Sequence, residues 1–238
     1  MNFFILCFLC VICACSAQSI NLSAGNNANK SFIDVGNRHG MTPLHLAIQR
    51  GYHNMTKLLI AGGANVSAET EYGDTPLHKA VIYKNVYAVE LLLKKNVNIN
   101  AKNNHGESPL YLAVLSDIFQ IAKMLVEHGA LIDDEDKSPI AVAISNDRAD
   151  IMELFLSHGV SVDDKVGNNY FLHFAINNGA DKVTKLLLDK GADYSIVNEN
   201  GESLLYMAVY YGNLEIAELI INATKPSTIE NNTYPSAQ

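Results

Sequence analysis

A unit of about 33 residues recurs six times along this chain of 238 residues. The first unit carries Thr42-Pro43-Leu44-His45, and related tetrapeptides begin at Thr75, Ser108, Ser138, Tyr170 and Ser203, at spacings of 33, 33, 30, 32 and 33 residues. A second marker has the same spacings: Leu58, Leu91, Met124, Leu154, Leu186 and Leu219. Two markers in one phase indicate an array of small units, each of which buries its apolar face only by stacking on its neighbours.

Each unit is predicted to fold as a helix, a tight turn, a second helix and an extended finger. A hydroxyl residue before proline, as in Thr75-Pro76, starts a helix because the hydroxyl caps free backbone N–H groups and proline loses no hydrogen bond there. Gly51 suits the turn between the helices, and Gly63 suits the end of the second helix. The second helix is expected to place Leu58-Leu59 and the equivalent pairs of later units in the core.

The pattern from Gly40 to Ala47 and from Gly63 to Val66 resembles the ankyrin repeat, and the resemblance covers about 190 of the 238 residues. It implies an all-α solenoid of about six helix-turn-helix units with short β-hairpin fingers. It also implies a noncatalytic module that binds a protein partner through its concave face and its fingers. The fourth unit is shortened, and Tyr170 replaces the usual threonine, so we expect irregular stacking near the fourth and fifth units.

These patterns divide the chain into four segments. Residues 1–17 are expected to form a signal peptide, 18–36 a polar linker, 37–225 the repeat domain and 226–238 a flexible tail. The six repeats are expected at about 37–69, 70–102, 103–134, 135–164, 165–197 and 198–225.

The N-terminal segment contains thirteen consecutive apolar residues, Phe3 to Cys15. This run is shorter than the roughly 20 residues of a membrane-spanning helix, and the small residues before Gln18 suit cleavage of a secretory signal. No lysine or arginine precedes the run, which departs from the usual signal pattern. We expect a secreted or periplasmic product; lipid anchoring at Cys15 and a buried first helix remain alternatives.

Catalytic, cofactor and metal sites are not predicted. All four cysteines lie within the first fifteen residues, which excludes a thiolate site in the repeats. A calcium loop of the EF-hand type starting at Asp134 would need glycine and glutamate where Pro139 and Ser145 stand. In the ankyrin family the histidine shared by His45, His78 and His173 supports hydrogen bonding within and between units, so the resemblance implies a structural role for it.

The net charge of −8 argues against a general nucleic-acid-binding protein, which needs a basic surface. Residues 127–164 hold ten acidic and two basic residues, and the remaining positions balance at fifteen of each. This acidic block is either a solubilising surface or a site for a partner with a basic surface.

By repeat position, the predicted partner-binding residues are Arg38, His39, Met41, Gln49, Arg50, Glu71, Tyr72, Asp74, Ile82, Tyr83, Asn103 and Asn104, together with the acidic residues Asp133, Asp134, Glu135 and Asp136. Tyrosine and arginine among them are typical of binding hot spots. An alternative function is an oligomeric or cell-envelope scaffold, because the last expected helix carries the apolar residues Ile216, Leu219, Ile220 and Ile221 at the end of the stack, where a polar face is usual.

Overall fold

The computed structural model describes residues 32–134 and 136–224. They belong to one compact unit that begins at Phe32. The predicted signal peptide, most of the linker, Glu135 and the predicted tail lie outside the described residues, so these expectations remain predictions.

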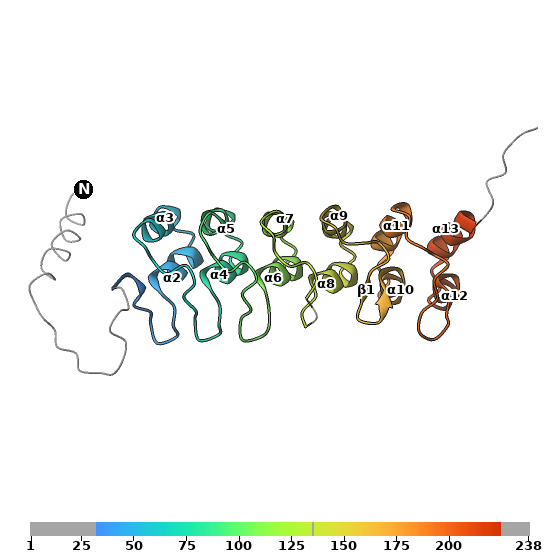
Figure 1. Ribbon diagram of the computed structural model, residues 1–238, viewed down its shortest axis with the longest axis horizontal. Helices are drawn as coiled ribbons and strands as arrows, with labels where there is room; N and C mark the ends of the chain where they lie inside the picture. Colours follow the sequence, from blue (N-terminus) through green and yellow to red (C-terminus); the bar gives the residue numbers. More distant parts are fainter. Residues whose placement is uncertain (1–31, 135, 225–238) are drawn as a thin grey trace, which may run out of the picture. The chain divides into compact units, whose positions relative to one another are not determined.

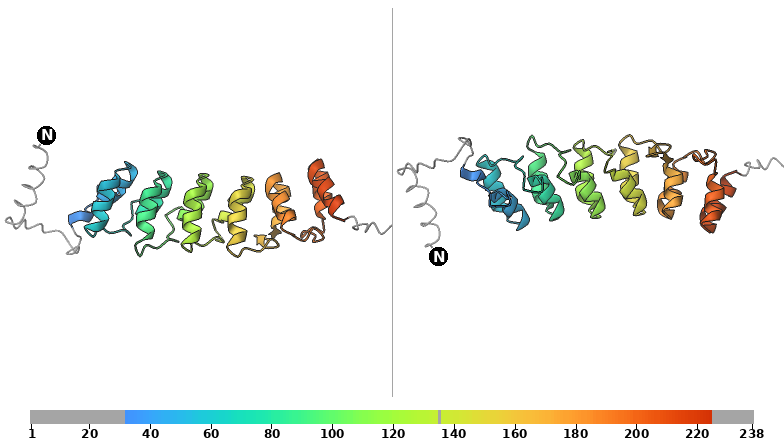
Figure 2. Two further views of the ribbon diagram at one scale, coloured as in Figure 1. Left: turned by 90° about the horizontal axis from the view of Figure 1, so that it is seen from above. Right: turned by 90° about the horizontal axis from the view of Figure 1, so that it is seen from below.

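Six helix pairs follow one another in a row, with the first helices in one layer and the second helices in another (Figures 1 and 2). A short 3-10 helix, η1 (Phe32–Asp34), precedes them. The first helices are α2 (Pro43–Gln49), α4 (Pro76–Ile82), α6 (Pro109–Leu115), α8 (Pro139–Ser145), α10 (Phe171–Asn177) and α12 (Leu204–Tyr210). The second helices are α3 (His53–Ala61), α5 (Val86–Leu93), α7 (Phe119–Glu127), α9 (Ala149–Ser157), α11 (Asp181–Asp189) and α13 (Leu214–Thr224). The predicted all-α solenoid is confirmed.

Hydroxyl caps begin five of the six first helices. The Thr75 side chain accepts a hydrogen bond from the backbone N–H of His78, and the His78 ring accepts one in return from the backbone N–H of Thr75, which closes a capping box. Ser108, Ser138 and Ser203 cap α6, α8 and α12 in the same way without the return bond from histidine. Tyr170, by contrast, gives α10 no side-chain cap.

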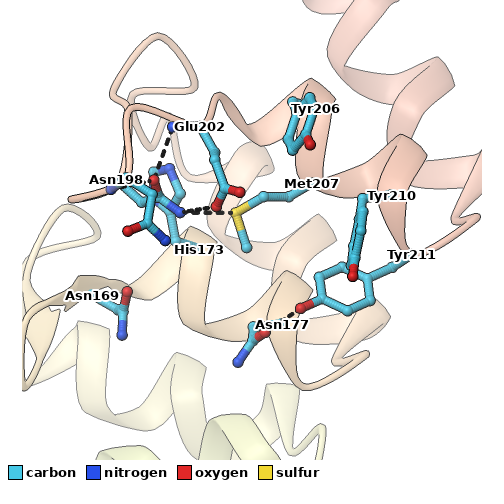
Figure 3. A pocket seen from close by; sticks show the side chains of 10 residues that line it. Asn169, His173, Asn177, Asn198, Glu202, Tyr206, Met207, Tyr210 and Tyr211 are labelled. Atoms are coloured by element: carbon cyan, nitrogen blue, oxygen red, sulfur yellow. Dashed lines mark hydrogen bonds between the residues drawn. The ribbon is translucent and has the colours of Figure 1, made fainter.

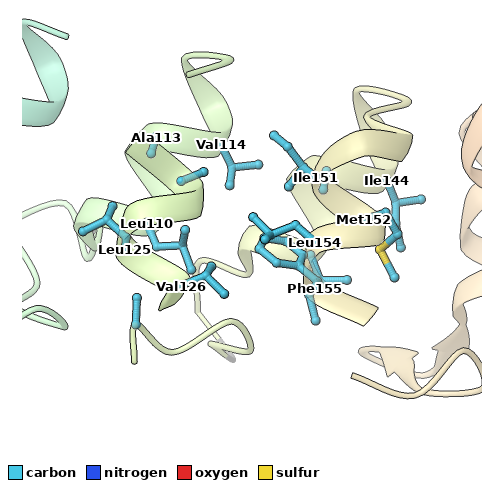
Figure 4. Close-up of a cluster of buried hydrophobic side chains, with 14 of the residues drawn as sticks. Leu110, Ala113, Val114, Leu125, Val126, Ile144, Ile151, Met152, Leu154 and Phe155 are labelled. Atoms are coloured by element: carbon cyan, nitrogen blue, oxygen red, sulfur yellow. The ribbon is translucent and has the colours of Figure 1, made fainter. Parts of the chain in front are cut away.

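The core runs along the stack between the two layers, as Figure 4 shows for the third and fourth units, where Leu125 and Phe155 are fully buried. The buried row lies one position after the second sequence marker. Leu58 is 63% exposed, whereas Leu92 is fully buried. The expectation that both leucines of the first unit's pair lie in the core is therefore wrong for Leu58, which faces outward at the end of the stack.

The order of the stack is kept near the fourth and fifth units, but α8 packs less extensively on α10 than on α6, so the expected irregularity is seen as a looser contact between these first helices. There α8 contacts both α6 and α10, and α9 contacts both α7 and α11. The tight turns are kept because Lys84, Asp117 and Asp147, which replace glycine, adopt the same left-handed backbone conformation, with φ between 51° and 58°.

The fingers differ from one another in their closure. One of them forms paired strands, β1 (Lys165–Val166) and β2 (Asn169–Tyr170), which run antiparallel. The second finger is closed by a turn instead, with the Thr70 N–H donating to the Asp74 carbonyl at 3.1 Å and the Gly73 N–H donating to the Thr70 carbonyl at 2.9 Å. The predicted β-hairpin thus appears as strands at β1 and β2 and as a tight turn in this second finger.

Across the described residues, no helix has both the length and the apolar character needed to cross a membrane.

Candidate functional site

The finger face, which we define as the exposed side of the first helices together with the fingers, carries most of the predicted partner-binding residues. Those that are exposed are Arg38, Arg50, Glu71, Tyr72, Ile82, Tyr83, Asn104, Asp133 and Asp136, and those that are half-buried are His39, Met41, Gln49 and Asp134. Glu135 lies outside the described residues.

Asp74 and Asn103 depart from the predicted exposure, because their side chains are buried, at 5% and 7% exposed. Asn103 Nδ2 donates to Asp74 Oδ1 at 3.1 Å, and Lys79 Nζ donates to Asp74 Oδ2 at 2.7 Å. Burial alone would raise the pKa of Asp74, but the hydrogen bonds from Lys79 and Asn103 outweigh it and lower the pKa. These two residues join the second finger to the third rather than presenting polar groups to solvent.

The first three fingers are tied together by hydrogen bonds between neighbours. The Glu71 N–H donates to the His39 carbonyl at 2.9 Å, and His39 Nδ1 lies 2.8 Å from Glu71 Oε1. The His39 hydrogen bond lowers the pKa of Glu71. On the other side, the Asn104 N–H donates to the Tyr72 carbonyl at 2.9 Å. The fingers are therefore held in fixed positions relative to each other.

A hollow of about 300 Å³ lies between these fingers and the first helices. We call it the N-terminal hollow. It is lined by His39, Met41, Gln49, Thr70, Glu71, Tyr72, Lys79 and Tyr83, of which six were predicted from the sequence as partner-binding residues. The structure thus brings residues from two repeats together into one concave site.

The acidic block is largely engaged within the chain. Lys102 Nζ lies 2.8 Å from Asp134 Oδ1 and 3.5 Å from Asp136 Oδ2. Asp147 Oδ1 accepts a hydrogen bond from the Val183 N–H at 2.9 Å. Carboxylates that already hold partners are less available to a basic surface, so the block makes a weaker docking site than its charge alone suggests.

The histidines of the first two units link each first helix to the next finger. His45 Nδ1 lies 2.9 Å from Thr42 Oγ1, and its Nε2 lies 3.2 Å from the Asp74 carbonyl oxygen. His78 repeats this arrangement, with its Nε2 3.0 Å from the Glu107 carbonyl oxygen. Burial lowers the pKa of His45 to about 4, so this imidazole is neutral near pH 7. The geometry is that of a structural bridge.

His173 occupies the same repeat position in a different setting. It is 2% exposed, and neither ring nitrogen has a hydrogen-bond partner among the described residues. Tyr170 stands where the four earlier units have threonine or serine, so no capping hydroxyl is available to the ring. Burial lowers the pKa of His173, and the nearby Glu202 carbonyl opposes this shift only in part.

Beside His173 lies a cavity of about 370 Å³ between α10 and α12 (Figure 3). We call it the C-terminal cavity. Its lining combines amide, carboxylate and phenol groups with one histidine and one methionine: Asn169, His173, Asn177, Asn198, Asn200, Glu202, Tyr206, Met207, Tyr210 and Tyr211.

The sequence-based prediction missed this second site because it stopped at the third unit. Tyr210 and Tyr211 occupy in the sixth unit the positions that Ile82 and Tyr83 occupy in the second. Tyr210 is 73% exposed. Carrying the repeat positions through to the sixth unit would have identified this tyrosine pair.

Within residues 32–134 and 136–224, no group of three or more histidine, cysteine, aspartate or glutamate side chains is arranged to hold a metal ion.

Family models of ankyrin repeats match residues 11–103, 96–166 and 172–221. Among solved structures, the ankyrin repeat domain of Bcl-3 is 27% identical with a TM-score of 0.70, covering 79% of this chain and 86% of that one. An ankyrin repeat domain from Acinetobacter baumannii is 25% identical with a TM-score of 0.67, and the match covers 76% of this chain and 97% of that one. A chain from the complex of the Bdellovibrio bacteriovorus predatory endopeptidase Bd0816 with immunity protein Bd3460 is 28% identical with a TM-score of 0.63, covering 78% and 100%.

The curated relatives match over shorter segments. A putative ankyrin repeat protein of fowlpox virus is 40% identical over 57 residues, which are 24% of this chain and 40% of that protein. The human NAD-capped RNA hydrolase NUDT12 is 40% identical over 52 residues, which are 22% of this chain and 11% of the hydrolase. The chain thus spans less than half the length of these relatives.

Proposed function

Because this chain belongs to the ankyrin-repeat family, whose domains generally mediate protein–protein interaction, we propose that it binds a protein partner through its finger face without catalysing a reaction. The observation that carries the proposal is the N-terminal hollow, where fingers from two repeats are fixed to each other by hydrogen bonds and surround exposed Tyr72 and Tyr83. A surface that is ordered before binding loses less conformational entropy when a partner docks.

The similar chain in the endopeptidase–immunity protein complex supports this proposal, because that complex is an assembly of two proteins. Tyrosine also supplies a large rigid contact area and is enriched at binding hot spots.

The test compares Tyr72→Ala/Tyr83→Ala with Tyr52→Ala as a matched control. Tyr52 is an exposed tyrosine at the start of α3, outside the hollow. A partner isolated with the native chain from its source would be purified, and its dissociation constant measured against each variant by calorimetry. Hot-spot losses of 2 kcal/mol or more are roughly 30-fold in affinity, so we expect at least about a 30-fold loss for the double variant. Equal affinities for double variant and control would contradict the proposal.

Export is the second part of the proposed function. It rests on the apolar run from Phe3 to Cys15 followed by small residues before Gln18. A fusion of residues 1–20 to a reporter that is active only after export should be active, and the mature native chain should begin at Gln18 or at a lipidated Cys15. An intact Met1 on the bulk of the native protein would contradict export.

An oligomeric scaffold is the alternative function, and one observation favours it. Helix α13 buries Ile216 and Ile220 against the stack but leaves Leu214 70% and Ile221 43% exposed. Light scattering on the purified chain separates the two functions, because a scaffold should give a multimer that Leu214→Glu dissociates, whereas a binding module should give the mass of one chain.

A further inference from the structure

We propose that the C-terminal cavity receives an arginine side chain of the protein partner, with its guanidinium group held beside Glu202 and His173. The inference rests on the proposed function, since it names the chemistry of the group that the partner presents to this part of the finger face.

The reason for a cavity here becomes clear when the junction of the second and third units is compared with the junction of the fifth and sixth, 95 residues later. Around His78, the space is filled by the Thr75 hydroxyl and by the ion pair of Lys79 with Asp74. The equivalent residues around His173 are Tyr170, Phe174 and Asn169. The fifth unit has thus lost the cation, its carboxylate partner and the hydroxyl that bonds the histidine ring.

One carboxylate is kept at the later junction. Glu202 corresponds to Glu107, and it accepts a hydrogen bond at 2.7 Å from Asn198, as Glu107 does at 3.0 Å from Asn103. Among the described residues that line the cavity, Glu202 is the only one with a formal charge near pH 7. An incoming cation would therefore meet a negative group and no cation in the lining, whereas an anion would be repelled. Lys165, whose Nζ lies 4.3 Å from the centroid of the Tyr170 ring, is outside the lining residues.

The remaining polar groups favour a ligand with several hydrogen-bond donors. A neutral imidazole keeps one nitrogen as an acceptor. Asparagine side chains add both carbonyl oxygens and N–H donors, and the oxygens of Asn177 and Asn198 already accept hydrogen bonds from Tyr211 and from the Asn200 and Glu202 backbone. His173 brings an imidazole ring to the cavity. The Glu202 backbone carbonyl lies near the ring but makes no hydrogen bond of ordinary geometry with it, so a donor that reaches the acceptor nitrogen would satisfy a buried group. A guanidinium group has five N–H donors and no acceptor, which matches the Glu202 carboxylate and the acceptor nitrogen of His173.

Aromatic rings form one side of the cavity, as Figure 3 shows. The Tyr206 and Tyr210 rings are stacked with centroids 6.4 Å apart, and the Tyr211 ring meets the Tyr210 ring edge-on at 5.1 Å. Tyrosine faces attract cations, and a planar guanidinium group stacks on them better than a compact ammonium group does. The aromatic wall therefore favours arginine over lysine.

The first experiment uses N-acetyl-arginine methylamide, which mimics an arginine within a protein, and follows the imidazole nitrogen resonances of the full chain by NMR. We expect saturable shifts at His173 with a dissociation constant in the range of about 1–10 mM, as ordinary for so small a ligand, and no shifts at His78. The citrulline analogue, which lacks the charge, should bind at least about tenfold more weakly because it loses a charge-assisted hydrogen bond.

Glu202→Gln should lower the affinity for the arginine probe by about tenfold. Glu107→Gln, the matched substitution at the junction of the second and third units, should leave that affinity unchanged. Folding of both variants is checked by circular dichroism. An unshifted His173 at saturating probe, or equal binding of the arginine and citrulline probes, would overturn the inference. Tighter binding of free arginine than of the blocked probe would also overturn it, because the source would then be an amino acid rather than a protein.

The inference and the proposed function fail in different ways. If the probe does not bind while the partner still depends on Tyr72 and Tyr83, the inference is wrong and the proposed function stands. If the probe binds at His173 but the double tyrosine variant keeps full affinity for the partner, the proposed role of the N-terminal hollow is wrong.

Discussion

The junction between the second and third units and the junction between the fifth and sixth are built on the same repeat pattern but end differently. At the first, His78 is bonded on both ring nitrogens, to Thr75 and to the Glu107 carbonyl. At the second, His173 is equally buried and bonded on neither, and a cavity of about 370 Å³ lies beside it. The backbone scaffold is retained in both cases, with α4 against α6 and α10 against α12.

The difference shows how one repeat position serves two purposes. A buried polar group without a partner costs about 1–3 kcal/mol, so the open junction is less stable than the closed one by an amount of that order. The stack tolerates the loss because its leucines and alanines still pack between the layers on both sides of the gap. Polar groups that the fold leaves unused are the ones available to a ligand.

The largest expected effect comes from Gly73 in the second finger, compared with its equivalent Gly201 in the sixth finger, beyond which no further finger is described. Gly73 and Gly201 share one repeat position and the same φ of 75°, but a Cβ added at Gly73 would lie 2.8 Å from the Asn104 backbone nitrogen, and one added at Gly201 would meet nothing. Both substitutions to alanine carry about 1–2 kcal/mol of left-handed strain, and the contact should raise the cost at Gly73 to about 3 kcal/mol or more. Urea denaturation measures both, and equal costs would mean that the fingers are not held together.

The second-largest effect is a loss of unfolding free energy in acid, at the junction where His45 links the first helix pair to the second finger. Because burial holds the pKa of His45 at about 4, below the unfolded value of 6.5, the unfolded chain binds more protons between these pH values. The stability from the neutral ring is complete above pH 6.5 and is lost as the pH falls towards 4, by about 2–3 kcal/mol at pH 4.5. His45→Gln should flatten the pH dependence of the unfolding free energy over this range by that amount; an unchanged slope would place the acid-sensitive group elsewhere.

Substitutions at the helix cap can remove the hydroxyl from the second–third junction and introduce one at the fifth–sixth junction. Thr75→Val keeps the side-chain shape and removes the hydroxyl, so it should lower the free energy of unfolding by about 1–2 kcal/mol. At the open junction, Tyr170→Thr should be more stable than Tyr170→Val by a similar amount, since only threonine restores the cap of α10 and a partner for His173. Thermal unfolding of the native chain and the three variants gives both differences; no gain of Tyr170→Thr over Tyr170→Val would show that the missing hydroxyl is not what opens the junction.

The repeat phase could be predicted because its markers recur at regular spacing along the chain. The hydroxyl caps and the turns could be predicted because each depends on residues only a few positions apart. Both leucines of the Leu58-Leu59 pair were expected in the core, but Leu58 is exposed, since adjacent apolar residues in a short helix do not reveal which of them faces the next unit. Asp74 and Asn103 were expected at the surface because polar finger residues usually are; their burial depends on contact between fingers 29 residues apart.

The C-terminal cavity could not be predicted from the sequence. Tyr170 is visible as a departure from the pattern, but whether its larger ring fills the gap or leaves it open depends on packing in three dimensions. The comparison of equivalent residues at the two junctions identifies the groups that are lost, and only the structure shows that the space is not refilled.

The smallest effect concerns the turn inside the units, where the N-terminal and C-terminal parts of the stack differ again. Lys84 and Asp147 both replace glycine with φ above 50°. Lys84→Gly should raise the free energy of unfolding by about 0.5–1 kcal/mol, because relief of left-handed strain exceeds the entropy cost of glycine. Asp147→Gly should gain nothing, because it also removes the oxygen that accepts the Val183 N–H at the start of α11. Urea denaturation distinguishes the two, and a stabilising Asp147→Gly would mean that this bond between units contributes little to the stack.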